Sequence, residues 1–314
     1  MRIQTAPAKR WTERERLGAQ GGGMNGGIFV VSDKNKRGYI EKRMQRRDIE
    51  HQIAEREITA LQRVGHHPYI TTMVDHFIDY RRGEASIYLE RCTGSSLQRL
   101  IERHARNHNE MIAEYYLWNW FMQIAEALSY CHYGPRPDHP PSRQSWNSIY
   151  HRDVKPANIL LTRIKEGPRE GEVIAQLADL GCSRTKADSS QGKANPLFQS
   201  ILTRDFAPPE SPRYLGQSDV WQLGAVMVCL CNLTMEFKRG PLRTHPESPA
   251  GPKYSRKLNL MIKECMLERY DERPKSDRIL GLLQKTYRSI EDDLPRGPEP
   301  LLPTRSNTSG RRQP

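Results

Sequence analysis

The sequence predicts an α+β protein in which a strand-rich segment precedes a longer helical one. Between Trp11 and about Glu90 the apolar residues fall mainly in short runs typical of β-strands, with one stretch of helical spacing. After Cys92 they recur at helical intervals over longer stretches. With 314 residues and a hydrophobic content of 36%, the chain is long enough for one large domain or a two-lobed one.

The strand-rich segment contains four short β-type runs and one helical stretch. The helical stretch, Arg47–Val64, has apolar residues at the three- and four-residue intervals of an amphipathic helix. We expect strands at Ile28–Val31, Tyr39–Lys42, Ile70–Ile78 and Ala85–Leu89.

The second segment is predicted to be helical, with a single β-hairpin. Two short apolar runs flank the turn at 163–172 and form that hairpin, and residues 182–206 are polar and mostly without pattern. The helices are expected at Leu97–His104, Met111–His132 and approximately 218–233, 256–267 and 276–289.

Three stretches are expected to lie outside the folded core. Residues 1–11 look like a flexible lead, and Gly134–Asn147 is a proline-rich insertion that should form an exposed loop. Residues 291–314, rich in Pro, Arg, Ser and Gly, are expected to be a disordered basic tail.

Composition limits the class of protein without identifying a partner. The net charge of +12 favours acidic partners, although a basic solvated surface accounts for most of these residues equally well. Arg311 and Arg312 form too short a basic run to indicate nucleic-acid binding, which we consider unlikely on this ground. The six cysteines show no paired spacing, so we expect free thiols in a reducing compartment.

The chain shows no sequence signal for a membrane. Its first residues lack the apolar run of a signal peptide, and Leu223–Leu233, the longest apolar stretch, is too short to span a bilayer. We therefore expect an intracellular protein of the cytoplasm, the nucleus or both, and no membrane partner.

The densest chemical signal is the run His151–Asn158, which matches H-R-D-x-K-P-x-N. Asp179-Leu180-Gly181 follows 21 residues after Asn158, at the distance of one hairpin. Phosphoryl transfer needs a carboxylate to orient the attacking hydroxyl, and an Asn with an Asp to hold metal on nucleotide phosphates. The joint pattern resembles the eukaryotic protein kinase family.

The resemblance covers about residues 12–290 and implies the bilobal protein kinase fold. That fold has a small β-rich N-lobe with one main helix, expected at residues 12–91, and a larger α-helical C-lobe, expected at 92–290. Cys92–Leu97, the helix Ala113–His132 and the proline-rich insertion before Tyr150 look most like NIMA-related kinases, especially fungal ones. A role in cell-cycle control is implied by analogy.

A glycine cluster precedes the first expected strand, Ile28–Val31, and fits a phosphate-binding loop. Gly21, Gly23 and Gly26 satisfy G-x-G-x-x-G, and a β-type run follows rather than the helix of a dinucleotide-binding fold. By resemblance, Ile28 and Ile40 on the neighbouring strands would contact the adenine.

Lys42, 16 residues after Gly26, lies in a stretch similar to the V-A-I-K strand of kinases. It would neutralise the α- and β-phosphates, paired with Glu57 or, alternatively, Glu50. We expect Lys42→Met to lower turnover sharply with little loss of folding, since the lysine would sit in an open cleft.

The stretch from Leu89 to Leu97 looks like the hinge between kinase lobes. By resemblance, backbone groups of Glu90 and Cys92 would bond the adenine edge, Leu89 would be the gatekeeper, and Leu160 would form the floor beneath the adenine. The sequence by itself shows a strand that ends at a Gly-Ser turn.

The resemblance assigns one role to each polar residue of the two motifs. Asp153 would orient the acceptor hydroxyl or act as its base, and Lys155 would steady the γ-phosphate. Asn158 and Asp179 would bind Mg²⁺, a hard cation that prefers oxygen ligands. ATP, Mg²⁺ and a protein substrate with a Ser or Thr acceptor are therefore the implied cofactors and partner.

The segment Thr203–Glu210 resembles the end of the activation segment, T-x-x-Y-x-A-P-E. Thr203 would hydrogen-bond near Asp153 and Lys155, which is a trait of Ser/Thr kinases. Glu210 is expected to pair with Arg273, and Asp219 to anchor the catalytic loop through backbone amides.

Several features depart from the family pattern or stay open. Leu180 replaces the Phe of Asp-Phe-Gly and should still pack with Leu61, Met73 and His151, while Cys182 is either a reactive thiol or a small half-buried residue. As a hypothesis, phosphorylation at Ser200 or at the pair Ser189 and Ser190 raises activity, with Arg152 binding the phosphate.

Two other classes of function remain as alternatives to a protein kinase. The irregular glycine cluster, Leu180 and Pro208 favour a pseudokinase that acts as a nucleotide-binding scaffold. A kinase of small molecules or lipids is the other, and Lys155, Thr203 and the long activation segment argue for a polypeptide acceptor instead.

Overall fold

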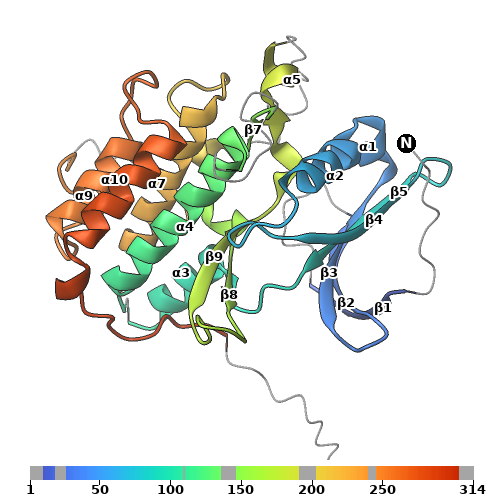
Figure 1. Cartoon of the computed structure of the whole chain (residues 1–314), viewed down its shortest axis with the longest axis horizontal. Helices are drawn as coiled ribbons and strands as arrows, with labels where there is room; N and C mark the ends of the chain where they lie inside the picture. The colour runs from blue at the N-terminus through green and yellow to red at the C-terminus, as the bar shows by residue number, and fades with distance from the viewer. Residues whose placement is uncertain are drawn as a thin grey trace, which may run out of the picture.

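The chain folds into two lobes joined by one extended segment. The computed structural model describes residues 10–17, 26–108, 110–135, 146–190, 203–239 and 245–303. Figure 1 shows a strand-rich lobe on the right, carrying α1 and α2, and a larger helical lobe on the left. The predicted α+β class with two lobes is confirmed.

The N-terminal lobe is an antiparallel sheet with the strand order β1-β2-β3-β5-β4. Four of its strands match the predicted runs, and β4 begins at Met73 rather than Ile70. The first strand was not predicted, because its sequence TERER has no apolar residue and every side chain in it is exposed. The strands are β1 Thr12–Arg16, β2 Gly27–Ser32, β3 Gly38–Met44, β4 Met73–Asp79 and β5 Glu84–Glu90.

The helical stretch of this lobe is broken in two, which corrects the prediction of one helix at 47–64. The first helix, α1, covers Arg46–Glu50, and the second, α2, covers Ile53–Val64. Between them Gln52 has φ of 58°, and such a left-handed residue cannot continue a right-handed helix. The spacing of apolar residues is helical on both sides of Gln52 and so does not show the break.

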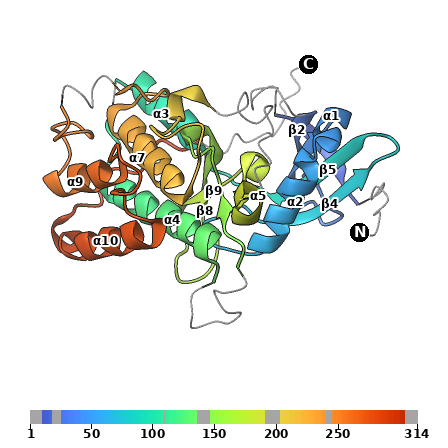
Figure 2. The ribbon, with the colours of Figure 1, turned by 90° about the horizontal axis from the view of Figure 1, so that it is seen from above.

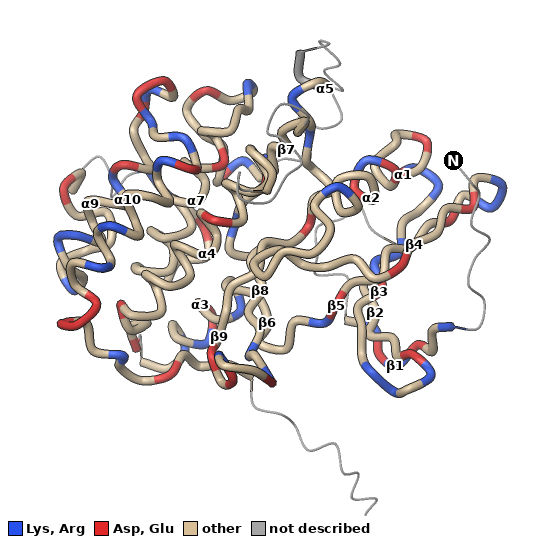
Figure 3. Tube along the Cα trace, in the orientation of Figure 1, with Lys and Arg blue, Asp and Glu red and all other residues tan. Residues whose placement is uncertain are grey.

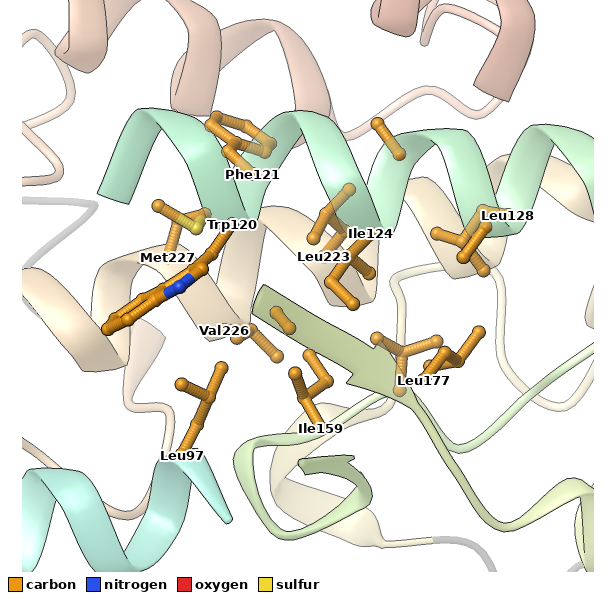
Figure 4. Packing of buried hydrophobic residues seen from close by; sticks show 14 of the residues in the cluster. Leu97, Trp120, Phe121, Ile124, Leu128, Ile159, Leu177, Leu223, Val226 and Met227 are labelled. Carbon is orange, nitrogen blue, oxygen red and sulfur yellow. The ribbon is translucent and has the colours of Figure 1, made fainter. Parts of the chain in front are cut away.

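The C-terminal lobe is built around two buried helices, α4 Glu114–Tyr133 and α7 Gly216–Asn232. Beside them lie α3 Leu97–Arg106, α9 Arg256–Cys265 and α10 Ser276–Arg288, all close to their predicted positions. Figure 4 shows Trp120 and Ile124 of α4 packed with Leu223 and Val226 of α7, above Ile159 and Leu177. This core fixes the segments that carry the polar motifs.

The predicted hairpin is present, and it connects the two polar motifs. Strands β8 Ile159–Arg163 and β9 Val173–Leu177 pair antiparallel, with Ile159 opposite Leu177. The register places Asn158 and Ala178 opposite each other, and the Ala178 amide donates to the Asn158 carbonyl at 2.8 Å. Asp179 therefore begins its segment next to Asn158.

The segment expected to be without pattern contains short elements. Strand β10 Arg184–Thr185 pairs with β7 Ile149–Tyr150, and α5 Lys186–Ser190 follows directly. Figure 2 shows α5 beside α2, and Asp188 and Thr59 line the same pocket between them. These elements are too short for a period to be visible in the sequence.

Residues 291–303 correct the prediction that everything after residue 290 is disordered. After the 3-10 turn η5 Glu291–Asp293, residues 294–303 form a C-terminal strap along the helical lobe (Figure 1). Leu294 and Leu302 pack on the core, and Leu301 donates its amide to His104 Nε2 at 3.1 Å. Its carbonyl accepts a hydrogen bond from Arg103 Nε. The strap was not predicted because its few apolar residues form no periodic pattern within a proline-rich sequence.

Substitution of Gly297 by Ala should loosen the C-terminal strap. Gly297 has φ of +67°, and an added Cβ would lie 2.6 Å from the Cβ of Ala113 at the start of α4. Gly167, in the β8–β9 turn, has φ of +88° with open space around it, so Gly167→Ala is the matched control. Both changes should lower the free energy of unfolding by about 1 kcal/mol, because alanine is strained in the left-handed conformation. Gly297→Ala should cost about 1–3 kcal/mol more through overpacking, visible in thermal unfolding. Equal melting temperatures would show that the strap does not press on α4.

Charged residues are spread over both lobes rather than gathered on one face. Figure 3 shows Lys and Arg interspersed with Asp and Glu along most exposed segments. Within the described ranges, no helix combines the length and apolarity needed to cross a bilayer.

Candidate active site

Lys42 reaches from β3 into a buried network of carboxylates. Its ammonium lies 2.8 Å from both Oε1 and Oε2 of Glu57 on α2, and 2.8 Å from Oδ1 of Asp179. Glu57, rather than the exposed Glu50, is therefore the partner of Lys42. The Lys42 side chain is 8% exposed and the Glu57 side chain 1%, so the pair is shielded from bulk water.

Burial and mutual attraction shift the pKa values of these three groups. Burial raises the pKa of Glu57 to about 7, against the attraction of Lys42. Burial alone would lower the pKa of Lys42, but the carboxylates of Asp179 and Glu57 outweigh it and raise that pKa. Burial would likewise raise the pKa of Asp179, yet the Lys42 charge and hydrogen bond bring it down to about 2. Lys42 therefore favours the ionised form of both carboxylates, and the two carboxylates favour the charged form of Lys42.

The loop His151–Asn158 lies between β7 and β8, and side chains satisfy its buried backbone. Asp219, on α7 and fully buried, accepts from the amides of His151 at 2.8 Å and Arg152 at 2.7 Å. Its Oδ2 also lies 2.8 Å from Nε2 of His132. Arg152 has φ of +71°, a strained conformation for a non-glycine residue that persists only when its surroundings hold it. The expected anchoring by Asp219 is present.

Asp219→Ala should therefore destabilise the helical lobe as well as the loop. The change leaves the amides of His151 and Arg152 and the imidazole of His132 without their acceptor, in a buried place. At about 1–3 kcal/mol for each unsatisfied buried group, we expect a loss of about 3 kcal/mol or more in the free energy of unfolding. Urea unfolding measures it, with the exposed Asp292→Ala as the control. A loss as small as that of the control would contradict the anchoring role.

Asp153 is the centre of a second polar network. Its Oδ2 lies 2.8 Å from Nζ of Lys155 and accepts from Nδ2 of Asn158 at 3.0 Å. Its Oδ1 accepts from the hydroxyl of Thr203 at 2.9 Å, and Lys155 donates to the same hydroxyl at 2.7 Å. Lys155 and Thr203 thus hold the Asp153 carboxylate from two segments.

Asn158 and Asp179 provide oxygen ligands suited to a divalent cation. The Asn158 amide nitrogen donates to Asp153, which leaves its Oδ1 directed elsewhere. The Asp179 side chain is 42% exposed, although Lys42 and the Gly181 amide bond its Oδ1. Within the described ranges no three His, Cys, Asp or Glu side chains form a metal cluster. Mg²⁺ held by one or two protein oxygens and by nucleotide phosphates needs no such cluster, so the residues fit the ion.

The residues proposed to contact adenine share a face of the N-lobe sheet with Lys42. Ile28 pairs with Lys42, and Ile40 with Leu89. Because side chains alternate along a strand, Ile28, Ile40, Leu89 and Lys42 all point to one side. Val30, opposite Ile40, belongs to the same face and was missed, although it continues the i, i+2 pattern from Ile28.

The hinge stretch and the floor residue lie beside each other at the lobe junction. The amide of Glu90 donates to the Thr72 carbonyl at 2.9 Å, which ties the end of β5 to the chain before β4. Cys92 donates its thiol to Gln176 on β9 at 3.2 Å, and burial raises its pKa to about 12. Leu160 pairs with Ser96 of the short strand β6 Ser95–Ser96, directly after the hinge stretch.

The pair predicted at the end of the activation segment is present. Arg273 is fully buried and donates to Glu210 at 2.8 Å and 3.2 Å. Leu180 is also buried, at 1% exposure, in the same hydrophobic cluster as Leu61 and Met73. Burial raises the pKa of the Cys182 thiol, which favours the unreactive interpretation.

Some residues for which the sequence predicts a role lie outside the part of the chain that the structure describes. They are Gly21, Gly23, Ser200 and the side chains of Ser189 and Ser190. Gly26 is described, and its amide donates to the Arg43 carbonyl at 2.8 Å.

Two lobes with a buried Lys–Glu pair in one and a polar loop in the other define a bilobal kinase-type domain. The family description "Protein kinase domain" matches residues 14–285. The chain therefore belongs to the protein kinase family.

Curated relatives fit the predicted resemblance to NIMA-related kinases. The chain is 27% identical to the serine/threonine-protein kinase Nek5 of Mus musculus, over 85% of this chain and 39% of that protein. It is 25% identical to the G2-specific protein kinase nimA of Emericella nidulans, over 90% of this chain and 42% of that protein. It is 28% identical to the G2-specific protein kinase fin1 of Schizosaccharomyces pombe, over 68% of this chain and 30% of that protein. The chain thus spans less than half the length of these relatives.

Proposed function

We propose that this chain is a serine/threonine protein kinase that transfers the γ-phosphoryl group of ATP to hydroxyl groups of protein substrates. The observation that carries the proposal is the pair of networks centred on Lys42 of the N-terminal lobe and on Asp153 of the C-terminal lobe. One suits the binding of a triphosphate and the other the positioning of an acceptor.

Transfer is direct and in line, with the acceptor oxygen bonding to phosphorus as the bond to the β-phosphate oxygen breaks. Asp153 orients the acceptor hydroxyl and receives the proton of that hydroxyl. Contacts with Lys155 and Thr203 hold the Asp153 carboxylate in position for this role. Lys155 offers positive charge beside Asp153, where the transferring group would pass. ADP leaves with the negative charge of the cleaved bond.

Lys42 and the adenine-facing residues hold the nucleotide. Lys42 would exchange part of its contact with Asp179 for the α- and β-phosphates, and Glu57 would keep it in place. Asn158 and Asp179 would hold Mg²⁺, which would supply positive charge to offset that of the phosphate oxygens. Gly21, Gly23 and Gly26 would cover the phosphates, while backbone groups of Glu90 and Cys92 would meet the adenine edge.

The acceptor is proposed to be Ser or Thr in a protein. The hydrogen bond of Lys155 to Thr203 supports this, because it joins the catalytic loop to the segment that precedes Glu210. A peptide library scanned with the purified chain would give the acceptor and its sequence context. Preferential labelling of tyrosine, or of a small molecule or lipid, would contradict the proposal.

A scaffold without transferase activity is the competing function, favoured by Leu180 and Pro208 in the motifs. Transfer of labelled phosphate from Mg²⁺-ATP to a generic Ser/Thr protein decides between them, run beside an Asp153→Asn variant. Labelling by the wild type and its loss in the variant support the kinase. Nucleotide binding without labelling in either protein supports the scaffold.

A role in cell-cycle control, in the cytoplasm or the nucleus, is proposed from the relatives named G2-specific kinases. We also propose that residues 12–290 form the kinase domain, divided near residue 91. Depletion of the protein in synchronised cells with no change in division timing would contradict the cell-cycle role.

A further inference from the structure

Gln222 is a buried amide on α7 that bonds two separate segments of the candidate active site. The residue is 1% exposed. Its Oε1 accepts from the amide of Val154 at 3.1 Å. Its Nε2 donates to the carbonyls of Arg152 at 3.1 Å and Phe206 at 3.0 Å. One side chain thus touches both the catalytic loop and the activation segment.

The groups held by this amide surround Asp153. Arg152 and Val154 are the residues immediately before and after it. Phe206 ends the 3-10 turn η4, which begins directly after Thr203, and the Thr203 hydroxyl donates to Asp153 at 2.9 Å. The backbone on both sides of Asp153 and the turn beyond its hydroxyl partner are therefore fixed to the same point of α7.

An amide is the side chain that these three neighbours require. They offer one donor and two acceptors, and an amide supplies one acceptor oxygen and two donor hydrogens. The opposite orientation of the Gln222 amide would set donor against donor and acceptor against acceptor, so the assignment is unambiguous. A methionine of similar length would leave all three backbone groups unsatisfied in a buried place.

Asp219 holds the same loop from one turn earlier on α7. Residues three apart lie on the same face of a helix, and Asp219 accepts from the amides of His151 and Arg152. Asp219 bonds the loop alone, whereas Gln222 reaches the carbonyl of Phe206 as well. Of Asp219 and Gln222, therefore, only Gln222 connects the catalytic loop to the activation segment.

We propose that Gln222 is a positioning residue that sets the separation between Asp153 and the activation segment after Thr203. It thereby determines how an acceptor hydroxyl meets the Asp153 carboxylate. This inference rests on the proposed kinase function for its kinetic consequences, and on the contacts alone for its structural ones.

Gln222→Met tests the proposal beside Gln123→Met as a matched control. Gln123, on α4, is also buried and accepts from the amide of Ala175 at 2.8 Å, away from the loop of Asp153. We expect Gln222→Met to lower kcat for a peptide about tenfold or more and to raise its KM, with the KM for ATP unchanged. Gln123→Met should lower the melting temperature without this kinetic pattern.

Gln222→Glu adds a readout that a purely structural role would not move. A carboxylate can accept from Val154 but cannot donate to Arg152 or Phe206, whereas its protonated form regains one donor. Burial raises the pKa of such a group above that of an exposed glutamate. Activity of Gln222→Glu relative to wild type should therefore rise as the pH falls, and a constant ratio would overturn the proposal.

Hydrogen exchange separates a failure of this proposal from a failure of the kinase function. Even without transferase activity in the wild type, Gln222→Met should speed amide exchange in both 151–158 and 203–210, and Gln123→Met in neither. Faster exchange in one of the two segments alone, or unchanged kcat and KM in an active enzyme, would overturn the connecting role of Gln222. If Gln222→Met does not fold, Gln222→Glu gives the same two readouts, kinetic and hydrogen exchange, when it is measured at high pH with its carboxyl ionised.

Discussion

Asp153→Asn should lower kcat by about 10²–10⁴-fold, the usual contribution of a positioned acid or base. The carboxylate accepts from Thr203 and Asn158 and lies 2.8 Å from Lys155. An asparagine keeps the shape but loses the charge that attracts the acceptor proton. The KM for ATP should change little, because the proposed contacts to the nucleotide arise mainly from the other lobe.

Single-turnover transfer of labelled phosphate to a peptide measures this effect on the chemical step. Asp292→Asn, an exposed change in the turn after α10, is the control and should leave the rate unaltered. A rate for Asp153→Asn within tenfold of wild type would show that another group orients the hydroxyl. Circular dichroism and melting temperature verify that the variant is folded.

Lys42→Met should abolish most activity and, contrary to the expectation from sequence, also destabilise the fold. Lys42 does not sit in an open cleft, because its side chain is 8% exposed and contacts the 1% exposed Glu57. Removing one partner of a buried ion pair costs about 3–5 kcal/mol, since the other charge stays buried without compensation. Loss of the phosphate-binding charge should lower kcat by about 10²-fold or more.

The double variant Lys42→Met/Glu57→Met separates the two effects. Replacing both buried charges by apolar groups of similar size is often neutral for stability, so we expect most of the lost stability to return. Activity should not return, because the cation is still missing. Lys263→Met is the control, since its partner Glu247 is exposed and such surface pairs contribute about 0–1 kcal/mol.

The pH dependence of Lys42→Met gives a further check on the buried carboxylate. Burial already raises the pKa of Glu57 to about 7 from its usual 4.5, and removal of Lys42 raises it further. Above pH 4.5 the folded variant then binds more protons than the unfolded chain, so its stability falls as the pH rises toward the folded pKa. Urea unfolding of the single variant should show this slope, and the double variant should lack it. An equal slope in both would place the titrating group elsewhere.

Much of the candidate site could be predicted because its residue types occur at fixed local spacings. The run His151–Asn158 and Asp179 were placed correctly at the two ends of one hairpin, whose apolar strands are visible in the sequence. The choice of Glu57 over Glu50 followed from the distance in sequence to His67–Ile70, which resembles the spacing in kinases, and it was confirmed by the contact with Lys42. Tertiary context was not needed to find these residues.

Other elements gave no readable signal, for identifiable reasons. Strand β1 has no apolar residue, since all its side chains face solvent. The C-terminal strap depends on Leu294 and Leu302 meeting the core and on backbone bonds of Leu301, none of which composition reveals. Gln222 was overlooked, although a polar residue within the apolar run of α7 is the kind of exception that marks a buried hydrogen-bonding role.

The sequence by itself determined the family, the order of elements and the residues at the site, because motifs and apolar periods are local properties of the chain. The tertiary structure alone decided which atoms meet and how far they are shielded from water. Lys42 and Asp179 lie 137 positions apart, yet their 2.8 Å contact raises the pKa of Lys42 and lowers that of Asp179. Desolvation and Coulomb attraction depend on distance in space, and that distance exists only once the lobes are folded together.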